Sequence, residues 1–216
     1  MCRAEPATER LSRSFYERET SLVARELLGA RLLGRRPDGT LFEARIVETE
    51  AYLGPHDLAS HTARGRTPRN AVMFGPPGHA YVYLVYGLHF CLNFVTEPVG
   101  HGSAVLIRAV ELEPAPGSPS SREARCDGPA RLTRTLGINR ADNGLDVVGG
   151  DRLWVEAPSR PVIGVSVGKR VGIAYAGEWV DAPLRFWETG NPGVSPVGEA
   201  RVHRAGRAVD SKALAP

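Results

Sequence analysis

Residues 45–61, RIVETEAYLGPHDLASH, alternate between two sets of side chains, and this pattern constrains the fold more than any other stretch. The first set is Ile46, Glu48, Glu50 and Tyr52, and the second is Val47, Thr49, Ala51 and Leu53. A period of two predicts a half-buried β-strand whose second face packs on a core. Glu48, Glu50 and Tyr52 then share one face, and the ~6.6 Å between successive same-side positions lets both carboxylates face one cleft. A merely solvated polar face remains the alternative, because acidic side chains usually point at water.

The segments before this strand predict a helix and a hairpin. Thr20 is placed to cap a helix that runs to Leu28, and Gly29 follows it as a stop signal. Residues 31–35 are expected to form a strand that returns through the turn signal Pro-Asp-Gly at 37–39 into the strand from Leu41. Glu50 is therefore expected on a rigid element.

The composition is that of a globular protein with a mild preference for anionic partners. Of 216 residues, 42% are hydrophobic and 24% charged, with a net charge of +3 and a pI of about 8.9. Three cysteines without a CxxC pair argue against a disulfide framework or a structural zinc site. Residues 1–13 lack an apolar signal core, and the apolar run 80–95 is too short and too polar to span a membrane. We expect a cytoplasmic protein, associated with the nucleoid if it is bacterial.

A basic loop follows the first strand. Arg64, Arg66 and Arg69 fall within six positions with no apolar residue between them to anchor a helix or strand. Such a loop is often only a solvated surface, but beside a cleft it is also where contacts to nucleic-acid phosphates are placed. The sequence leaves these two interpretations open.

A second hairpin is predicted from YVYLVY at 81–86 and FCLNFV at 90–95. Tyr86 lies at its tip, where a large apolar side chain lacks neighbours, and proteins that distort duplexes push such wedges between base pairs. Asn93 interrupts the second strand, and a buried amide needs a specific partner. Arg108 interrupts the next strand, 103–112, and needs an anion, either Glu50 or a phosphate.

The remaining elements are weaker predictions. Residues 114–121 are rich in proline and serine and predict a mobile loop, and residues 129–136 predict a helix with proline at its start and Gly137 after its end. Short strands are expected at 152–156, 170–174 and 184–188. We expect one α+β domain over residues 1–216: a curved, mostly antiparallel sheet with flanking helices and a protruding hairpin, and flexible ends at about 1–14 and 201–216.

Several segments taken together resemble the alkyladenine (3-methyladenine) DNA glycosylase family of the non-helical type. The resemblance covers roughly residues 22–197, and its most specific pieces are RIVETEAYLGP, RTPRN with MF after it, YVYLVYG, FCLN, LIRA, GPARL, RVGI, AGEW and PLRF. So many segments in the same order make chance similarity untenable.

The resemblance implies a role for individual residues. Glu50 matches the general base that activates water, and Arg108 and the backbone carbonyl of Val171 match groups that position this water. Tyr52, His61, Tyr83 and Asn93 match residues that contact the extruded base, Asn93 also helping to exclude normal purines, and Tyr86 matches the residue that fills the gap in the duplex. Some relatives carry tyrosine and histidine where this chain has His89 and Tyr175. These two departures leave open which lesions are accepted and how DNA is bound.

The implied reaction is hydrolysis of the N-glycosidic bond of an alkylated purine flipped out of double-stranded DNA, leaving an abasic site. N3- or N7-alkylation makes the purine cationic and a good leaving group, which electron-rich aromatic walls also favour. No lysine is near Glu50 in the sequence, so a Schiff-base lyase step is not expected. The enzyme is expected to be a monofunctional monomer that needs no metal or cofactor.

Two other functions fit parts of the sequence. Glu48 and Glu50 can serve as the acid and base of an ordinary glycosidase or nucleosidase, because their spacing falls near the ~6.5 to 9.5 Å of inverting enzymes. A binding module without catalysis is the second alternative, because the fold resembles a domain appended to certain formyltransferases and fold does not determine function. The basic loop and the aromatic at the hairpin tip argue against the first alternative, and an intact Glu50 argues against the second.

Overall fold

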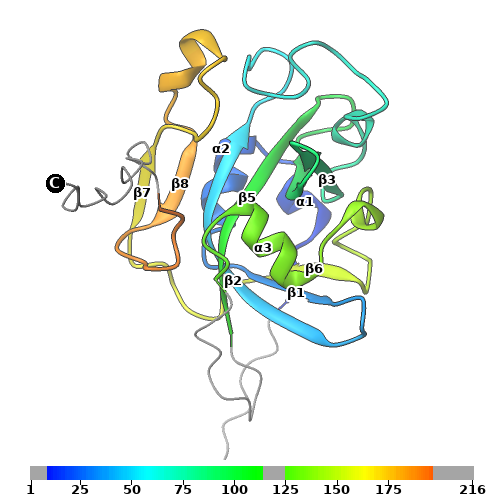
Figure 1. Cartoon of the computed structure of the whole chain (residues 1–216), viewed down its shortest axis with the longest axis vertical. Helices are drawn as coiled ribbons and strands as arrows, with labels where there is room; N and C mark the ends of the chain where they lie inside the picture. Colours follow the sequence, from blue (N-terminus) through cyan, green and yellow to red (C-terminus); the bar gives the residue numbers. More distant parts are fainter. Residues whose placement is uncertain (1–8, 114–124, 197–216) are drawn as a thin grey trace, which may run out of the picture.

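Strand β2 (Leu41–Tyr52) is the central strand of the sheet (Figure 1). Strand β5 (Ser103–Leu112) pairs with one edge of β2, while β1 (Arg31–Arg35) and then β8 (Arg185–Glu188) pair with the other edge. Residues 44–51 are all buried as a result. The expectation of a half-buried strand is therefore wrong, because β2 has neighbours on both edges and packed layers on both faces.

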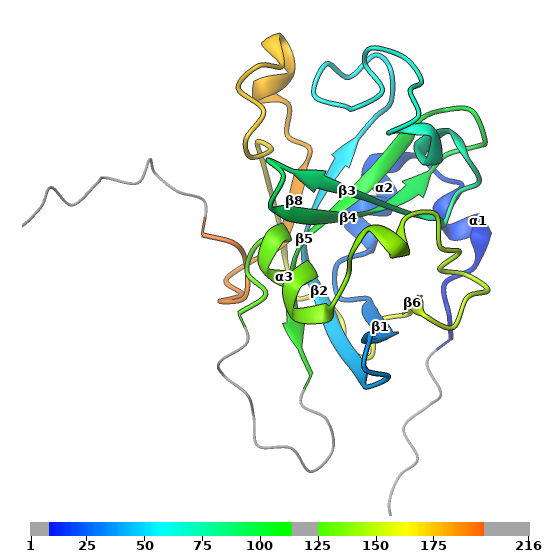
Figure 2. The same ribbon diagram turned by 45° about the vertical axis from the view of Figure 1, so that its right-hand side comes forward.

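All of the strand pairings within the sheet are antiparallel, and the order is β3-β4-β5-β2-β1-β6, with β8 joining β2 and β7 joining β8. The strands not yet bounded are β3 (Ala80–Val85), β4 (His89–Thr96), β6 (Leu153–Glu156) and β7 (Val165–Gly168). The sheet curves as it passes from β6 to the β3–β4 hairpin (Figures 1 and 2). The computed structural model describes residues 9–113 and 125–196, and these form the single α+β domain expected from the sequence.

Helices flank this sheet. The α-helices are α1 (Arg13–Tyr16), α2 (Thr20–Glu26) and α3 (Pro129–Leu136), and the 3-10 helices are η1 (Ala71–Phe74), η2 (Arg140–Asp142) and η3 (Gly177–Asp181). Helix α2 packs on β2, where the Thr49 hydroxyl donates to the Ala24 carbonyl at 2.7 Å. The cap of α2 is Glu19 rather than the expected Thr20, because the Glu19 carboxylate accepts from the backbone N–H groups of Ser21 and Leu22.

A β-bulge in the pairing of β2 with β5 changes the direction of the Arg108 side chain. The register passes from Ile46–Val110 to Glu48–Ala109 and then to Thr49–Ile107, so Arg108 has no partner position opposite it. β-Bulges bend a strand locally and redirect side chains. This one turns the guanidinium of Arg108 toward the acidic residues of β2.

The β3–β4 hairpin is confirmed and ends in a tight turn. The Leu88 N–H donates to the Val85 carbonyl at 3.1 Å, and the two central residues, Tyr86 and Gly87, have φ of 51° and 69°. Positive φ at both central positions is typical of the type I′ turn of two-residue hairpins. Tyr86 adopts this conformation despite its bulk and is 91% exposed at the tip.

The C-terminal part of the domain differs most from expectation. Residues 170–174 form no strand; the strand lies earlier, at β7, because Arg170 turns inward and Gly172 has a φ of 78°. The loop at 114–121 and the chain end from 201 lie outside the described residues. Of the expected flexible start, residues 9–14 are described, and there the Leu11 N–H donates to the Val155 carbonyl at 2.9 Å. No helix in the described ranges is long and apolar enough to cross a membrane.

Candidate active site

Glu50 lies fully buried near the C-terminal end of β2, with three hydrogen-bonding or charged partners. Its Oε1 accepts a 2.8 Å hydrogen bond from the backbone N–H of Val171 and lies 3.3 Å from Nη1 of Arg108. Its Oε2 accepts a 2.9 Å hydrogen bond from the Tyr52 hydroxyl. Of the expected catalytic set, the structure thus brings Glu50, Arg108, Tyr52 and Val171 into contact, with the N–H of Val171, rather than its carbonyl, facing Glu50.

The pKa of Glu50 is raised above its ordinary value of 4.5. Burial is the largest cause, because it penalises the charged carboxylate. Arg108, the Val171 N–H and the Tyr52 hydroxyl oppose the shift without cancelling it. A carboxylate with a raised pKa accepts a proton more readily than an exposed one, as a general base requires.

Glu48 has a different environment from Glu50. Its Oε1 accepts hydrogen bonds from Nε of Arg108 at 2.9 Å and from Nη1 of Arg185 at 3.2 Å, and its Oε2 accepts one from the Ser195 N–H at 2.7 Å. Its side chain is fully buried. Three donors therefore occupy Glu48, and Arg108 joins the two carboxylates.

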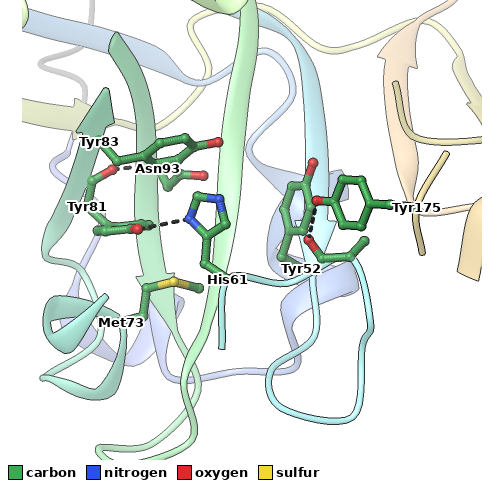
Figure 3. A pocket seen from close by; sticks show the side chains of 8 residues that line it. Tyr52, His61, Met73, Tyr81, Tyr83, Asn93 and Tyr175 are labelled. Carbon is green, nitrogen blue, oxygen red and sulfur yellow. Dashed lines mark hydrogen bonds between the residues drawn. The ribbon is translucent and has the colours of Figure 1, made fainter. Parts of the chain in front are cut away.

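An aromatic pocket lies beside Tyr52, the residue whose hydroxyl donates to Glu50, and Figure 3 shows the side chains that line this pocket. The pocket is lined by Tyr52, Ala59, His61, Met73, Tyr81, Tyr83, Asn93 and Tyr175. All four residues expected to contact a base, Tyr52, His61, Tyr83 and Asn93, are among these. They come from β2, the loop after it and the β3–β4 hairpin, so the curved sheet brings together residues that are distant in sequence.

Hydrogen bonds hold the walls of this pocket. His61 Nδ1 lies 2.9 Å from the Tyr81 hydroxyl, and the His61 and Tyr83 rings are 4.4 Å apart between centroids. The pKa of His61 is lowered, first by burial of its ring and then by the charge of Arg69, which favours a neutral imidazole. The Asn93 amide donates to the Tyr81 carbonyl at 3.0 Å, which gives this buried side chain the partner expected from the sequence.

The pocket is small, and Tyr175 forms part of its wall. Its volume of about 40 Å³ has room for only about three water molecules. Tyr175 is 70% exposed, and its hydroxyl is tied to the pocket wall by one 3.3 Å hydrogen bond to the Ala59 carbonyl. A planar base therefore requires side-chain movement to enter, and Tyr175 is the lining residue with the greatest freedom to rotate.

A groove of about 630 Å³ runs beside the hairpin, and the exposed Tyr86 and two arginines, Arg69 and Arg140, help to line it. Arg69 is anchored there, because its Nη2 donates to the Leu84 carbonyl at 3.0 Å and its guanidinium lies 5.7 Å from the centre of the Tyr83 ring. Arg64 and Arg66 are exposed on the same loop but line neither the groove nor the aromatic pocket. The loop is shaped by the buried Asn70, whose amide donates to the carbonyls of His61 and Gly65.

A buried ion pair lies against the ring of Tyr52. Arg170 donates from Nη1 and Nη2 to the two carboxylate oxygens of Asp57 at 2.5 and 2.8 Å, and neither side chain is exposed. Nη1 of Arg170 also donates to the Ala51 carbonyl at 2.9 Å, and its guanidinium lies 4.8 Å from the centre of the Tyr52 ring. This pair fixes the segment that carries Val171 to the loop after β2.

Comparison with known proteins identifies the family. The model of the Methylpurine-DNA glycosylase (MPG) family matches residues 14–192. The chain belongs to this family.

Relatives of similar length support the same assignment. The chain is 51% identical to a protein of Myxococcus xanthus over 179 residues, and this alignment covers 82% of this chain and 89% of that protein. It is 50% identical over 194 residues to one of Anaeromyxobacter dehalogenans, covering 88% and 89%, and 47% identical over 188 residues to one of Legionella pneumophila, covering 86% and 98%. Each of the three carries the name "Putative 3-methyladenine DNA glycosylase".

Three residues that support the site without lining its pocket were not identified from the sequence. Asp57 stands in a loop where acidic residues are common, and Arg170 falls in an expected strand that the structure does not form. Arg185, which pairs with Glu48, lies in the PLRF segment of the resemblance and in a short expected strand, and neither signal reveals its partner. For Asp57 and Arg170, the one available signal was that they lie within two of the segments that resemble the family or beside them, which does not reveal that they pair.

Proposed function

We propose that this protein is a monofunctional DNA glycosylase that acts as a monomer on double-stranded DNA containing alkylated purines, 3-methyladenine and related bases. It rotates the damaged nucleotide out of the helix, binds the base in the aromatic pocket and hydrolyses the N-glycosidic bond, leaving an abasic site. The observation that carries this proposal is the juxtaposition of a buried carboxylate of raised pKa with a small pocket lined by aromatic side chains.

Glu50 acts as the general base in this mechanism. It takes a proton from the water that attacks C1′ of the deoxyribose and stabilises the positive charge of the oxocarbenium-like transition state. The Val171 N–H and Arg108 fix the Oε1 side, and Oε2 retains acceptor capacity beside its hydrogen bond from Tyr52. Arg108 also joins Glu50 to Glu48, so the Glu50 side chain cannot rotate without breaking its ion pair with Arg108.

The pocket selects alkylated purines through its walls. Tyr52, Tyr83 and the neutral His61 present π-faces and ring edges, and electron-rich aromatic faces favour a cationic base over a neutral one. Asn93 adds a polar group fixed by Tyr81, which restricts which edge of a purine fits. The cationic purine is also the better leaving group, so binding and chemistry select the same substrates.

The hairpin tip and the groove support action on duplex DNA. Tyr86 is exposed at a rigid turn, so its ring can enter the base stack and fill the gap left by the flipped nucleotide. Arg69 lines the groove beside it, and Arg64 and Arg66 are exposed on the same loop, where they can contact phosphates. None of these features serves a free nucleoside.

The environment of Glu48 disfavours a glycosidase or nucleosidase with two carboxylates. Glu48 accepts hydrogen bonds from Arg108, Arg185 and the Ser195 N–H, and it does not line the aromatic pocket where a leaving group would lie. Glu50 is the carboxylate that adjoins the pocket. A single working carboxylate suits a substrate whose leaving group already carries positive charge.

The proposal is tested by incubating methylated duplex DNA with the protein and separating the free bases released. We expect free 3-methyladenine in the soluble fraction and intact strands that break at abasic sites only after alkaline treatment. Strand breaks without alkali would indicate a lyase, and release of bases from free nucleosides at a similar rate would support the nucleosidase. Binding to the DNA with no release would support the binding module.

A further inference from the structure

Tyr52 lies between the aromatic pocket and a buried positive charge. The guanidinium of Arg170 is 4.8 Å from the ring centre, its side chain is not exposed, and it does not line the pocket. A base bound against Tyr52 from the pocket side would therefore have Arg170 behind the ring. At a stacking separation of ~4.5 Å, the two charges would be roughly 9 Å apart with no water between them.

An uncompensated arginine in this position works against a cationic base. It occupies the π-face that would otherwise attract the ligand, and its charge repels a second cation across the ring. Arg69 has a similar relation to Tyr83, but Arg69 reaches the surface, where solvent screens its charge. Among the described residues, Asp57 is the ion-pair partner of the buried Arg170, and it contacts the guanidinium through both carboxylate oxygens.

We propose that Asp57 is a positioning and specificity-determining residue that neutralises Arg170 behind Tyr52, so that the pocket accepts cationic purines. The ion pair then has two tasks. Arg170 holds Tyr52 and the Val171 segment in place. Asp57 neutralises the positive charge that Arg170 would otherwise place behind the base-binding face of Tyr52. The inference rests on the proposed function, because it concerns which base the pocket prefers.

The charge balance predicts opposite effects for two variants. Asp57→Asn leaves Arg170 positive and should lower the preference for a cationic base by about 10- to 30-fold, for charges roughly 9 Å apart at an effective dielectric constant of about 20. Arg170→Gln removes the positive charge and leaves the Asp57 carboxylate, which still accepts from the Leu53 and Ala59 N–H groups, and should raise that preference. The double variant Asp57→Asn/Arg170→Gln should restore the original preference to within about threefold.

The experiment measures affinity rather than turnover, in a Glu50→Gln background. Each variant is titrated with two duplexes of one sequence, one with a single 7-methylguanine and one with guanine at that position, and the ratio of the two Kd values is the readout. Arg66→Gln is the matched control: Arg66 is exposed and lines neither the aromatic pocket nor the groove, so its loss should weaken the binding of both duplexes and leave the ratio unchanged. Thermal unfolding of each variant is recorded beside its titration.

The outcomes separate this inference from the proposed function. If the Glu50→Gln protein itself shows no preference for the 7-methylguanine duplex, the proposed function fails. If that preference is present and either folded single variant leaves it unchanged, or both lower it alike, the ion pair is only structural and the inference is wrong. Because the two single variants move the ratio in opposite directions, either one suffices if the other does not fold.

Discussion

The backbone N–H of Val171 donates a 2.8 Å hydrogen bond to Oε1 of Glu50, joining residues 121 positions apart in the sequence. This bond closes the site, because it links the C-terminal part of β2 to the segment between β7 and η3. It also orients Glu50 with a group that no side-chain substitution removes. The same segment carries Arg170, so the orientation of the proposed base depends on the buried pair with Asp57.

The raised pKa of Glu50 makes both activity and stability depend on pH. Base release should rise with pH through the folded-state pKa, which lies above 4.5, because only the ionised carboxylate accepts a proton. For stability, the folded protein binds this proton more tightly than the unfolded chain. Glu50 therefore contributes stability that is fully present below pH 4.5 and is lost as pH rises through the folded-state pKa.

The comparison with Glu50→Gln isolates this effect. The free energy of unfolding of the wild type should fall relative to that of Glu50→Gln as pH rises from about 4 to about 8. Urea unfolding at several pH values measures it. If the difference in the free energy of unfolding between the two proteins stays constant, or if it changes in favour of the wild type, the ionised Glu50 carboxylate does not destabilise the folded state.

Glu48→Gln should damage the fold more than the chemistry. It removes the negative partner shared by Arg108 and Arg185 in the interior, and breaking a buried ion pair costs about 3 to 5 kcal/mol. We expect a large drop in the free energy of unfolding, with base release per folded molecule reduced less than in Glu50→Gln. Equal losses of release in the two folded variants would revive the two-carboxylate glycosidase.

Tyr86→Ser should impair action on duplex DNA selectively. Base–aromatic stacking is worth ~1 to 3 kcal/mol, so the flipping equilibrium should move back toward the stacked duplex by roughly 5- to 150-fold. Serine at an exposed tip should leave stability almost unchanged. Base release is measured on matched duplex and single-stranded substrates, and equal impairment on both would mean that Tyr86 does not act as a wedge.

Arg66→Ala and Arg69→Ala should differ although they lie on one loop. Removing one arginine that binds a phosphate should reduce the slope of log K against log salt by about 0.9. Arg66 is exposed, so its removal should change only the slope and affinity, whereas Arg69 also braces the hairpin at Leu84 and Tyr83 and should in addition slow base release. If neither variant changes slope or affinity, the loop is only a solvated surface.

The sequence predicted the elements whose signals are local. The turn at residues 37–39, the aromatic hairpin and helix α3 with its flanking glycine appear as expected. The period of two in residues 46–53 placed Glu48, Glu50 and Tyr52 on one face, and Arg108 now joins the two carboxylates. Pattern alone could not show that β2 is central, because burial depends on neighbours 60 to 140 positions away.

The pairing of distant groups could not be predicted from the sequence. The interior contacts of Asp57 with Arg170 and of Glu48 with Arg185 leave no periodic signature, because a single charged residue in a loop or strand has the same pattern whether it is solvated or paired. The small aromatic pocket likewise depends on side-chain packing between elements. These are the features that distinguish Glu50 from Glu48.

The central claim is that Glu50 is the general base for base release, and single-turnover kinetics on a duplex with one 3-methyladenine or 7-methylguanine test it most directly. Glu50→Gln should bind this duplex as tightly as the wild type while releasing the base at least ~10²-fold more slowly, the lower range for losing a positioned general base. Release by Glu50→Gln at a rate close to that of the wild type, with the duplex bound equally well, would contradict the account.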